Sequence, residues 1–178
     1  YNARKSVKFI IIDMYSPYVS LIKKMFPNAQ IIIDRFHLVQ LISRSLNKTR
    51  IRAMKSNKSA YNKMKRYWKL LLKNRNELDF SKWKRYTCFP NLMTEIDVVN
   101  YILDQDKELK VTYFKYQELL QSIKEKNYDN FIYAITNVDN SISDYIKTSI
   151  KTLTEFKYEI RNTFNNNYHN GFIEGNNN

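Results

Sequence analysis

The sequence predicts an α/β fold in which a small strand-helix-strand unit carries a large, mainly α-helical insertion. Two short runs of β-branched residues, 8–13 and 29–34, are separated by a segment of helix length. After residue 35, apolar residues recur at helical spacing for most of the chain. Short apolar runs bounded by turn residues are typical of buried strands, and a helical crossover between them makes the two strands parallel.

The first unit places two carboxylates at one edge of the predicted sheet. Its helix starts at Ser16 and Pro17, a cap residue followed by a first-turn proline, and ends before Pro27. Each strand finishes in an aspartate, Asp13 or Asp34. Ligands of open α/β sheets gather at the carboxyl ends of the strands. Either aspartate could instead be the N-cap of the helix that follows it.

The remaining segments are predicted to be helical, with an irregular connector among them. A last amphipathic helix opens at Ser141, with Asp144 placed for a capping box, and runs through Phe164. We expect three parts: a core part with a basic helix at 1–55, a helical insertion at 56–140, and a C-terminal core segment at 141–178. Within these parts we expect basic helices after residue 35 and at 61–73, followed by the connector at 77–92. Three further helices are expected at about 94–108, 110–126 and 128–136, and Thr94 is the expected N-cap of the first.

Composition excludes several classes of protein. The chain has 178 residues, a single cysteine and a formal net charge of +13. A lone Cys88 excludes an internal disulfide framework and a cysteine-based zinc cluster. No apolar run approaches the roughly 20 residues of a membrane span, and Tyr1 onward does not read as a signal peptide. We therefore expect a basic, cytoplasmic protein that makes no membrane contact.

The positive charge is concentrated in the first part of the chain. Residues 1–76 contain 18 Lys and Arg but two acidic residues, a net charge of +16, whereas residues 77–178 have a net charge of −3. A coding bias toward lysine does not explain why acidic residues are missing from one part. The asymmetry indicates a polyanion-binding face, with an ordinary solvated surface as the alternative.

The residues that could carry chemistry are carboxylates. Asp13 and Asp34 are the two acidic residues of the basic part, where a carboxylate can hold a divalent cation against a bound phosphate. The chain has no glycine-rich phosphate loop, nucleophile elbow or zinc-binding histidine pair. Its two glycines, Gly171 and Gly175, flank Glu174, where they allow close approach to a ligand or form an ordinary terminal loop.

Four short blocks form a combined pattern across nearly the whole chain. They read Asp13-Met14-Tyr15-Ser16-Pro17-Tyr18, Phe26-Pro27-Asn28-Ala29, Asp34-Arg35-Phe36-His37 and Asn170-Gly171-Phe172-Ile173-Glu174-Gly175-Asn176-Asn177. In order and spacing they resemble the ISL-three family of insertion-sequence transposases, mobile-element enzymes of the DDE group. The resemblance implies a ribonuclease-H-like core and DNA recombination by transposition.

The resemblance also implies roles for particular residues. The family's second catalytic Asp maps to Asp13 and its catalytic Glu to Glu174. Together these two would bind Mg²⁺ or Mn²⁺ for cleavage and strand transfer of DNA. The family's Asp-x-x-His motif maps to Asp34 and His37, in a supporting role at the active site or in holding DNA. For His37 alone, a hydrogen-bonded structural role is the stronger expectation.

The partners implied are DNA, both element ends and target, and further copies of the protein in a homo-oligomer. Basic side chains would contact the DNA backbone without reading its sequence. The residues assigned to these contacts are Arg35, Arg44, Lys48, Arg50, Arg52, Lys65 and Arg66.

The chain also departs from the family's pattern. The family's first catalytic Asp and the expected upstream zinc-ribbon and helix-turn-helix region find no match, and the chain stops at Asn178, shortly after Glu174. We therefore expect a fragment that is inactive on its own.

Two alternatives stay open: a noncatalytic helical nucleic-acid-binding module, and a ribonuclease-H-like nuclease without strand transfer. The transposase and module interpretations differ on whether Asp13 meets Glu174. If it does, the two carboxylates lie about 4–8 Å apart, with Asp34 at the same sheet edge.

Overall fold

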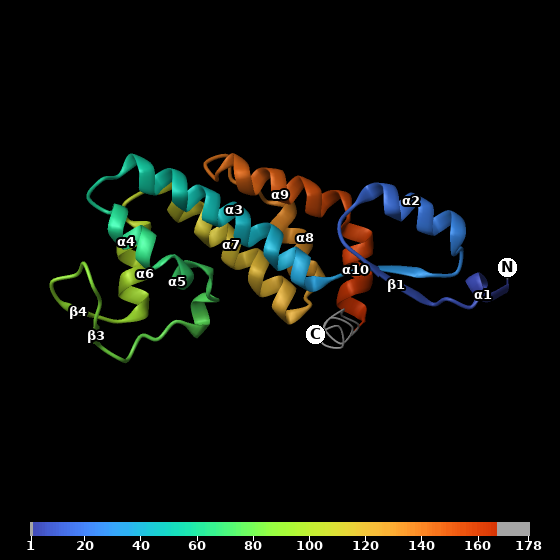
Figure 1. Ribbon diagram of the computed structural model, residues 1–178, viewed down its shortest axis with the longest axis horizontal. Coiled ribbons are helices and arrows are strands. Elements are labelled where there is room, and N and C mark those ends of the chain that lie inside the picture. The colour runs from blue at the N-terminus through green and yellow to red at the C-terminus, as the bar shows by residue number, and fades with distance from the viewer. Residues whose placement is uncertain (1, 167–178) are drawn as a thin grey trace.

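The computed structural model describes residues 2–166 and is a mixed α/β structure that is mostly helical (Figure 1). At one end of the elongated molecule, strands β1 (Phe9–Ile12) and β2 (Gln30–Ile33) pair in parallel. Helix α2 (Ser16–Met25) connects them, and the short helix α1 (Asn2–Lys5) precedes β1. The predicted strand-helix-strand unit is therefore confirmed. Pro17 lies in the first turn of α2 as expected, although Tyr15 rather than Ser16 is its N-cap.

Helix α3 (Arg35–Ser56) joins this unit to the helical part of the molecule (Figure 1). Its 22 residues extend about 33 Å at 1.5 Å per residue. Of the apolar residues that recur after residue 35, Leu38, Ile42 and Leu46 are fully buried, and Val39 is half-buried. Helices α7 (Lys107–Glu125) and α9 (Asp144–Glu155) pack against α3 along its length.

Two predicted helices are each divided in the structure. The basic helix at 61–73 breaks at Tyr67 into α4 (Tyr61–Arg66) and α5 (Trp68–Leu72), and the Tyr67 hydroxyl donates to the carbonyl of Thr87. The C-terminal helix turns at the buried Phe156 and continues as α10 (Lys157–Asn165). The turn lets α9 pack on α3 while α10 packs on β2, which one straight helix could not do.

The N-terminus of α9 also differs from the prediction. Ser143, not Ser141, is the N-cap, and its side chain accepts a hydrogen bond from the backbone of Ile146. Ser141 instead donates to the Asp139 carboxylate in the preceding turn. The expected capping box with Asp144 is therefore wrong.

The connector contains more regular structure than expected. Short strands β3 (Lys84–Arg85) and β4 (Leu92–Met93) form an antiparallel pair, and a 3₁₀ turn, η1 (Arg75–Glu77), precedes them. Thr94 caps helix α6 (Glu95–Leu103) as predicted, here with a complete capping box, and α8 (Tyr128–Thr136) follows α7.

One buried apolar cluster runs from Ile33 at the end of β2 to Phe164 in α10. Its largest fully buried side chains include Tyr113, Tyr116 and Phe131. Within residues 2–166, no helix has both the length and the apolar character needed to cross a lipid bilayer.

Candidate active site

Asp13 and Asp34 lie at the same edge of the strand pair. The register pairs Ile12 with Ile33, and each aspartate is the next residue of its strand. The backbone amide of Asp34 donates to the carbonyl of Ile12 at 3.2 Å, which extends the pairing to this edge. The predicted position of Asp34, on the neighbouring parallel strand at the edge that carries Asp13, is confirmed.

The Asp13 carboxylate contacts His37. The His37 Nε2 atom lies 2.9 Å from Asp13 Oδ1, and 62% of the Asp13 side chain stays exposed. His37 is the third residue of α3, so its ring reaches across from the helix to the loop after β1. The structure thus places the His37 ring within contact distance of the carboxylate that the resemblance assigns to catalysis.

Asp34 forms the N-cap of α3. Its Oδ1 atom accepts a hydrogen bond from the amide of Phe36 at 3.0 Å, and its carbonyl accepts one from the amide of His37 at 3.1 Å. The residue is buried, so its carboxylate faces the helix start rather than solvent. Asp34 therefore acts as the N-cap of α3, one of the two roles that the sequence allows for it. These hydrogen bonds fix the turn that carries His37.

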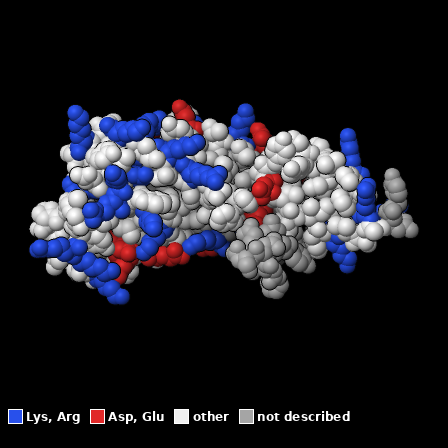
Figure 2. Space-filling model, viewed as in Figure 1, with Lys and Arg blue, Asp and Glu red and all other residues white. Residues whose placement is uncertain are grey.

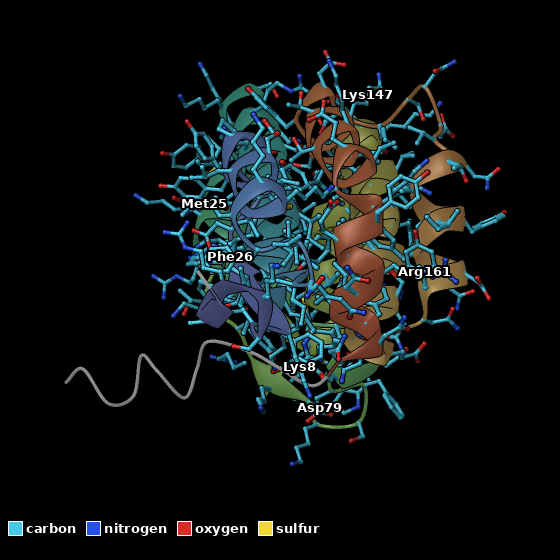
Figure 3. The ribbon with its side chains drawn as sticks, turned by 90° about the vertical axis from the view of Figure 1, so that its right-hand side faces the viewer. Lys8, Met25, Phe26, Asp79, Lys147 and Arg161 are labelled. Atoms are coloured by element: carbon cyan, nitrogen blue, oxygen red, sulfur yellow. The ribbon has the colours of Figure 1, made fainter. Side chains whose placement is uncertain are left out.

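Helix α10 binds the free edge of β2 near the aspartates. The Thr163 hydroxyl accepts a hydrogen bond from the amide of Ile33 at 2.9 Å and donates to the carbonyl of Ile33 at 2.8 Å. An ion pair of 3.1 Å between Lys23 and Glu159 joins α2 to α10. Figure 3 views the molecule from this end, with α2 and α10 side by side and Arg161 projecting from α10 on the side away from α2.

Of the two residues predicted to bind the metal, Asp13 lies within the residues that the structure describes. Glu174, and with it the expected contact to Asp13, lies outside the described residues. Among residues 2–166, no three His, Cys, Asp or Glu side chains lie close enough together to hold a metal ion. At the carboxyl edge of the strand pair the Asp13 carboxylate is exposed, and its oxygen atoms suit a hard cation such as Mg²⁺.

Exposed basic side chains extend along α3 away from this edge. Arg44, Lys48 and Arg52 recur every four residues and therefore share one face of the helix. Lys48 and Arg52 line a cavity of about 280 Å³ together with Lys55 and Tyr145. Figure 2 shows that Lys and Arg gather over the half of this face opposite the strand pair.

The other assigned basic residues occupy different surroundings. Lys65 and Arg66 are exposed at the end of α4, and Arg35 is half-buried in the first turn of α3. Arg52 also forms an ion pair with Glu108 of α7. These side chains keep enough exposure to contact a polyanion.

Arg50 does not belong to this surface. It is 7% exposed, and its Nη1 atom donates to the carbonyl of Met64 at 2.9 Å. Its Nε atom donates to Asn47 Oδ1, also at 2.9 Å. Burial lowers the pKa of Arg50 by removing water from the guanidinium. The assignment of Arg50 to DNA contacts is wrong, because its buried side chain forms a hydrogen bond that joins α3 to α4.

Sequence reasoning missed two contributors to these surfaces. Tyr145 of α9 lies under the cations of α3, with its ring centroid 5.8 Å from Lys48 Nζ and 5.6 Å from Arg52 Cζ. Thr163 bridges the edge of β2 from 130 residues away. Neither contact leaves a local signal in the sequence, because both depend on how distant helices pack.

A carboxylate at the edge of parallel strands beside a long basic surface is typical of proteins that act on nucleic acids. Comparison with known families identifies the group. A model of the ISL-three type of DDE transposase, described as "Transposase", matches residues 1–178, the whole chain. The chain therefore belongs to this family of insertion-sequence transposases.

A curated relative matches a smaller part of the chain. A Lactococcus lactis subsp. lactis protein named "ATP-dependent protease" is 33% identical over 82 residues, which are 46% of this chain and 26% of that protein. The match thus spans about a quarter of the relative's length. No solved structure matches the chain.

Proposed function

We propose that this chain forms part of the catalytic domain of a DNA transposase, with Asp13 and Glu174 as its metal-binding carboxylates. The observation that carries the proposal is the exposed Asp13 carboxylate, oriented by His37 at the carboxyl edge of a parallel strand pair. The proposal requires a ribonuclease-H-like core built from 1–55 and 141–178, with 56–140 as its helical insertion.

The position of α10 supports the pairing of Asp13 with Glu174. Thr163 holds the end of α10 against Ile33, the residue before Asp34. Glu174 follows Asn166 by eight residues, which can extend at most about 26–29 Å. The chain is therefore long enough to bring Glu174 back to the edge that carries Asp13.

The residues around Asp13 have separable roles in this proposal. Mg²⁺ or Mn²⁺ held by Asp13 and Glu174 would activate water, and then a 3′-hydroxyl, for attack on phosphate. His37 orients one carboxylate oxygen of Asp13 while the rest of the group stays exposed. Asp34 caps α3 and thereby fixes the turn from which His37 extends.

DNA is held in this proposal by the basic side chains that the structure leaves exposed. They neutralise phosphates and fix the duplex without reading its sequence. Helix α3 runs from the Asp13 edge into the basic surface, so one duplex can contact both. The residues proposed for DNA contacts are Arg35, Arg44, Lys48, Arg52, Lys65 and Arg66.

The catalytic assignment is tested in the intact transposase that contains this chain. A supercoiled plasmid bearing the element ends is incubated with Mg²⁺, and cut and joined products are separated on a gel. Asp13→Asn should abolish both products and leave duplex binding unchanged. Asp129→Asn, at an exposed acidic residue on α8, should behave like the parent. Full cleavage by the Asp13 variant would contradict the assignment, and cutting without joining by the parent would favour a nuclease.

The DNA-binding surface is tested by fluorescence anisotropy with labelled duplex DNA. Plotted against the logarithm of salt concentration, log affinity should fall linearly, and each lost phosphate contact should reduce the slope by about 0.9. Arg44→Glu and Lys48→Glu should both weaken binding. Lys151→Glu on α9, in the less basic part of the chain, should weaken it least. Equal losses for all three variants would refute this placement of the surface.

A further inference from the structure

A second surface lies at the end of the molecule opposite the strand pair of β1 and β2 (Figure 1). The connector that holds β3 and β4 forms this end (Figure 1). Three of its large apolar side chains face solvent: Phe80 is 78% exposed, Trp83 65% and Leu92 55%. Exposed apolar groups gathered on one short segment indicate an interaction site, whereas isolated ones do not. We call residues 80–93 the hairpin surface.

Basic residues alternate with the aromatic ones in this segment. Lys82, Lys84 and Arg85 are all exposed, and Lys82 and Lys84 directly flank Trp83 in the sequence. The nearby acidic side chains accept hydrogen bonds within the fold: Asp79 accepts from the amides of Ser81 and Lys82, Glu95 accepts from Lys73, and Asp97 belongs to the capping box of α6. The hairpin surface therefore presents cations and apolar rings to the same partner.

Two cavities of different character border the hairpin surface. An apolar cavity of about 490 Å³ is lined by Trp83, Phe89 and Leu92 among others. A cavity of about 450 Å³ is lined by Lys65, Arg66, Asn62 and Cys88. Since Cys88 and Phe89 are consecutive, an apolar cavity and a basic cavity share one stretch of the connector.

The aromatic floor of the hairpin surface is firmly anchored. The Phe89 ring packs edge-on against Tyr101 of α6 and lies 5.9 Å from the ring of Tyr67. The Lys63 ammonium lies 4.8 Å from the Tyr101 ring centroid and donates to the Tyr101 hydroxyl. Because these contacts tie the connector to α4 and α6, its cavities are formed before any ligand binds.

We propose that the hairpin surface binds unpaired bases of single-stranded DNA, with Trp83 stacking on a base and the Lys65–Arg66 cavity holding the adjoining phosphates. An apolar protein partner would offer nothing to the cations of this surface. Of these, Lys82 and Lys84 lie near Asp79 and Glu95, while Lys65, Arg66 and Arg85 are exposed. Single-stranded DNA offers flat apolar bases and phosphates in alternation, which matches both cavities. The inference rests on the proposed function for its ligand class, and it adds a binding site for unpaired DNA at the end opposite the strand pair.

Tryptophan fluorescence gives a direct test with the full chain. The chain has two tryptophans, Trp68 and Trp83, so Trp68→Phe leaves Trp83 as the reporter. Titration with a short oligothymidylate should quench this variant strongly. Trp83→Ala should weaken oligothymidylate binding by about 5- to 150-fold, the range for one stacked base. Trp83→Phe, which keeps an aromatic face, should recover most of the affinity.

Matched controls separate stacking from simple charge attraction. Tyr133→Ala removes an equally exposed ring on α8 and should bind oligothymidylate like the parent. Polyglutamate should neither quench Trp83 nor displace the oligonucleotide. The inference is overturned if Trp83→Ala binds oligothymidylate with parental affinity, or if polyglutamate competes equally well.

The same variants distinguish failure of this inference from failure of the proposed function. Lys48→Glu should weaken duplex binding on α3 and leave Trp83 quenching by oligothymidylate intact. Quenching at Trp83 without any duplex binding would contradict the proposed duplex surface and uphold the hairpin surface. If duplex binding depends on Lys48 but Trp83→Ala binds oligothymidylate like the parent, the hairpin surface is contradicted and the proposed duplex surface is supported.

Discussion

Replacing Arg50 with methionine separates a role in the fold from a role in DNA binding. The Arg50 guanidinium donates to the buried carbonyl of Met64 and to Asn47. A hydrogen bond from a charged donor contributes about 1.5–3 kcal/mol, and methionine restores part of the packing but neither bond. We expect the free energy of unfolding to fall by about 2–3 kcal/mol. For a protein of this size, that lowers Tm by about 4–12 °C.

Urea denaturation followed by circular dichroism measures this loss, and duplex anisotropy on the folded variant measures DNA binding. Arg44→Met is the matched control, because Arg44 is exposed on the same helix. Its free energy of unfolding should stay within about 0.5 kcal/mol of the parent while its DNA affinity falls. Arg50→Met should show the opposite pattern. An Arg50→Met variant with parental stability and weakened DNA binding would refute the structural role.

Two further variants test other parts of the fold. Thr163→Val should lower the free energy of unfolding by about 2 kcal/mol, because the amide and carbonyl of Ile33 lose their shared hydroxyl partner. Thr163→Ser should restore most of it, and a parental urea midpoint for the valine variant would show that the bridge is dispensable. At Glu95, burial raises the carboxyl pKa, but hydrogen bonds from the Lys73 ammonium and the Asp79 amide bring it below its ordinary 4.5. Ionised Glu95 therefore stabilises the fold above that pH, and this contribution is lost as the pH falls. Glu95→Gln should therefore flatten the decline of the urea midpoint at acid pH. An unchanged decline would contradict a stabilising role for the Glu95–Lys73 ion pair.

The parallel strand pair could be predicted because its signal is local. Two β-branched runs separated by one helix fix the topology, and the aspartate that ends each run then lies at a known edge. The contact between His37 and Asp13 could not be predicted in the same way. It depends on the rotation of the first turn of α3 relative to the loop after β1, which no spacing along the chain records.

Arg50 shows a second limit of sequence reasoning. On a helix with apolar residues at helical spacing, a basic residue such as Arg50 can face either solvent or a neighbouring helix, and the spacing alone does not distinguish the two. Arg50 faces α4 and not solvent, because α4 packs where the carbonyl of Met64 can accept a hydrogen bond from its guanidinium. The turn at Phe156 has a similar origin, since the apolar repeat continues through it and only β2 and α3 require two helix directions.

Helix α3 fixes the relation between the Asp13 edge and the basic surface. Buried hydroxyl pairs lock its rotation against α9: Ser45 Oγ lies 2.6 Å from Ser149 Oγ, and Thr49 Oγ1 lies 2.6 Å from Ser143 Oγ. Buried polar groups are costly unless they are paired, so a different rotation of α3 would cost the hydroxyl contacts that Ser45 and Thr49 make with the α9 segment. The rotation that satisfies them also turns the exposed cations of α3 outward and points His37 toward Asp13. The hydrogen bonds between α3 and the α9 segment therefore help to fix where the exposed cations of α3 lie relative to the Asp13 carboxylate.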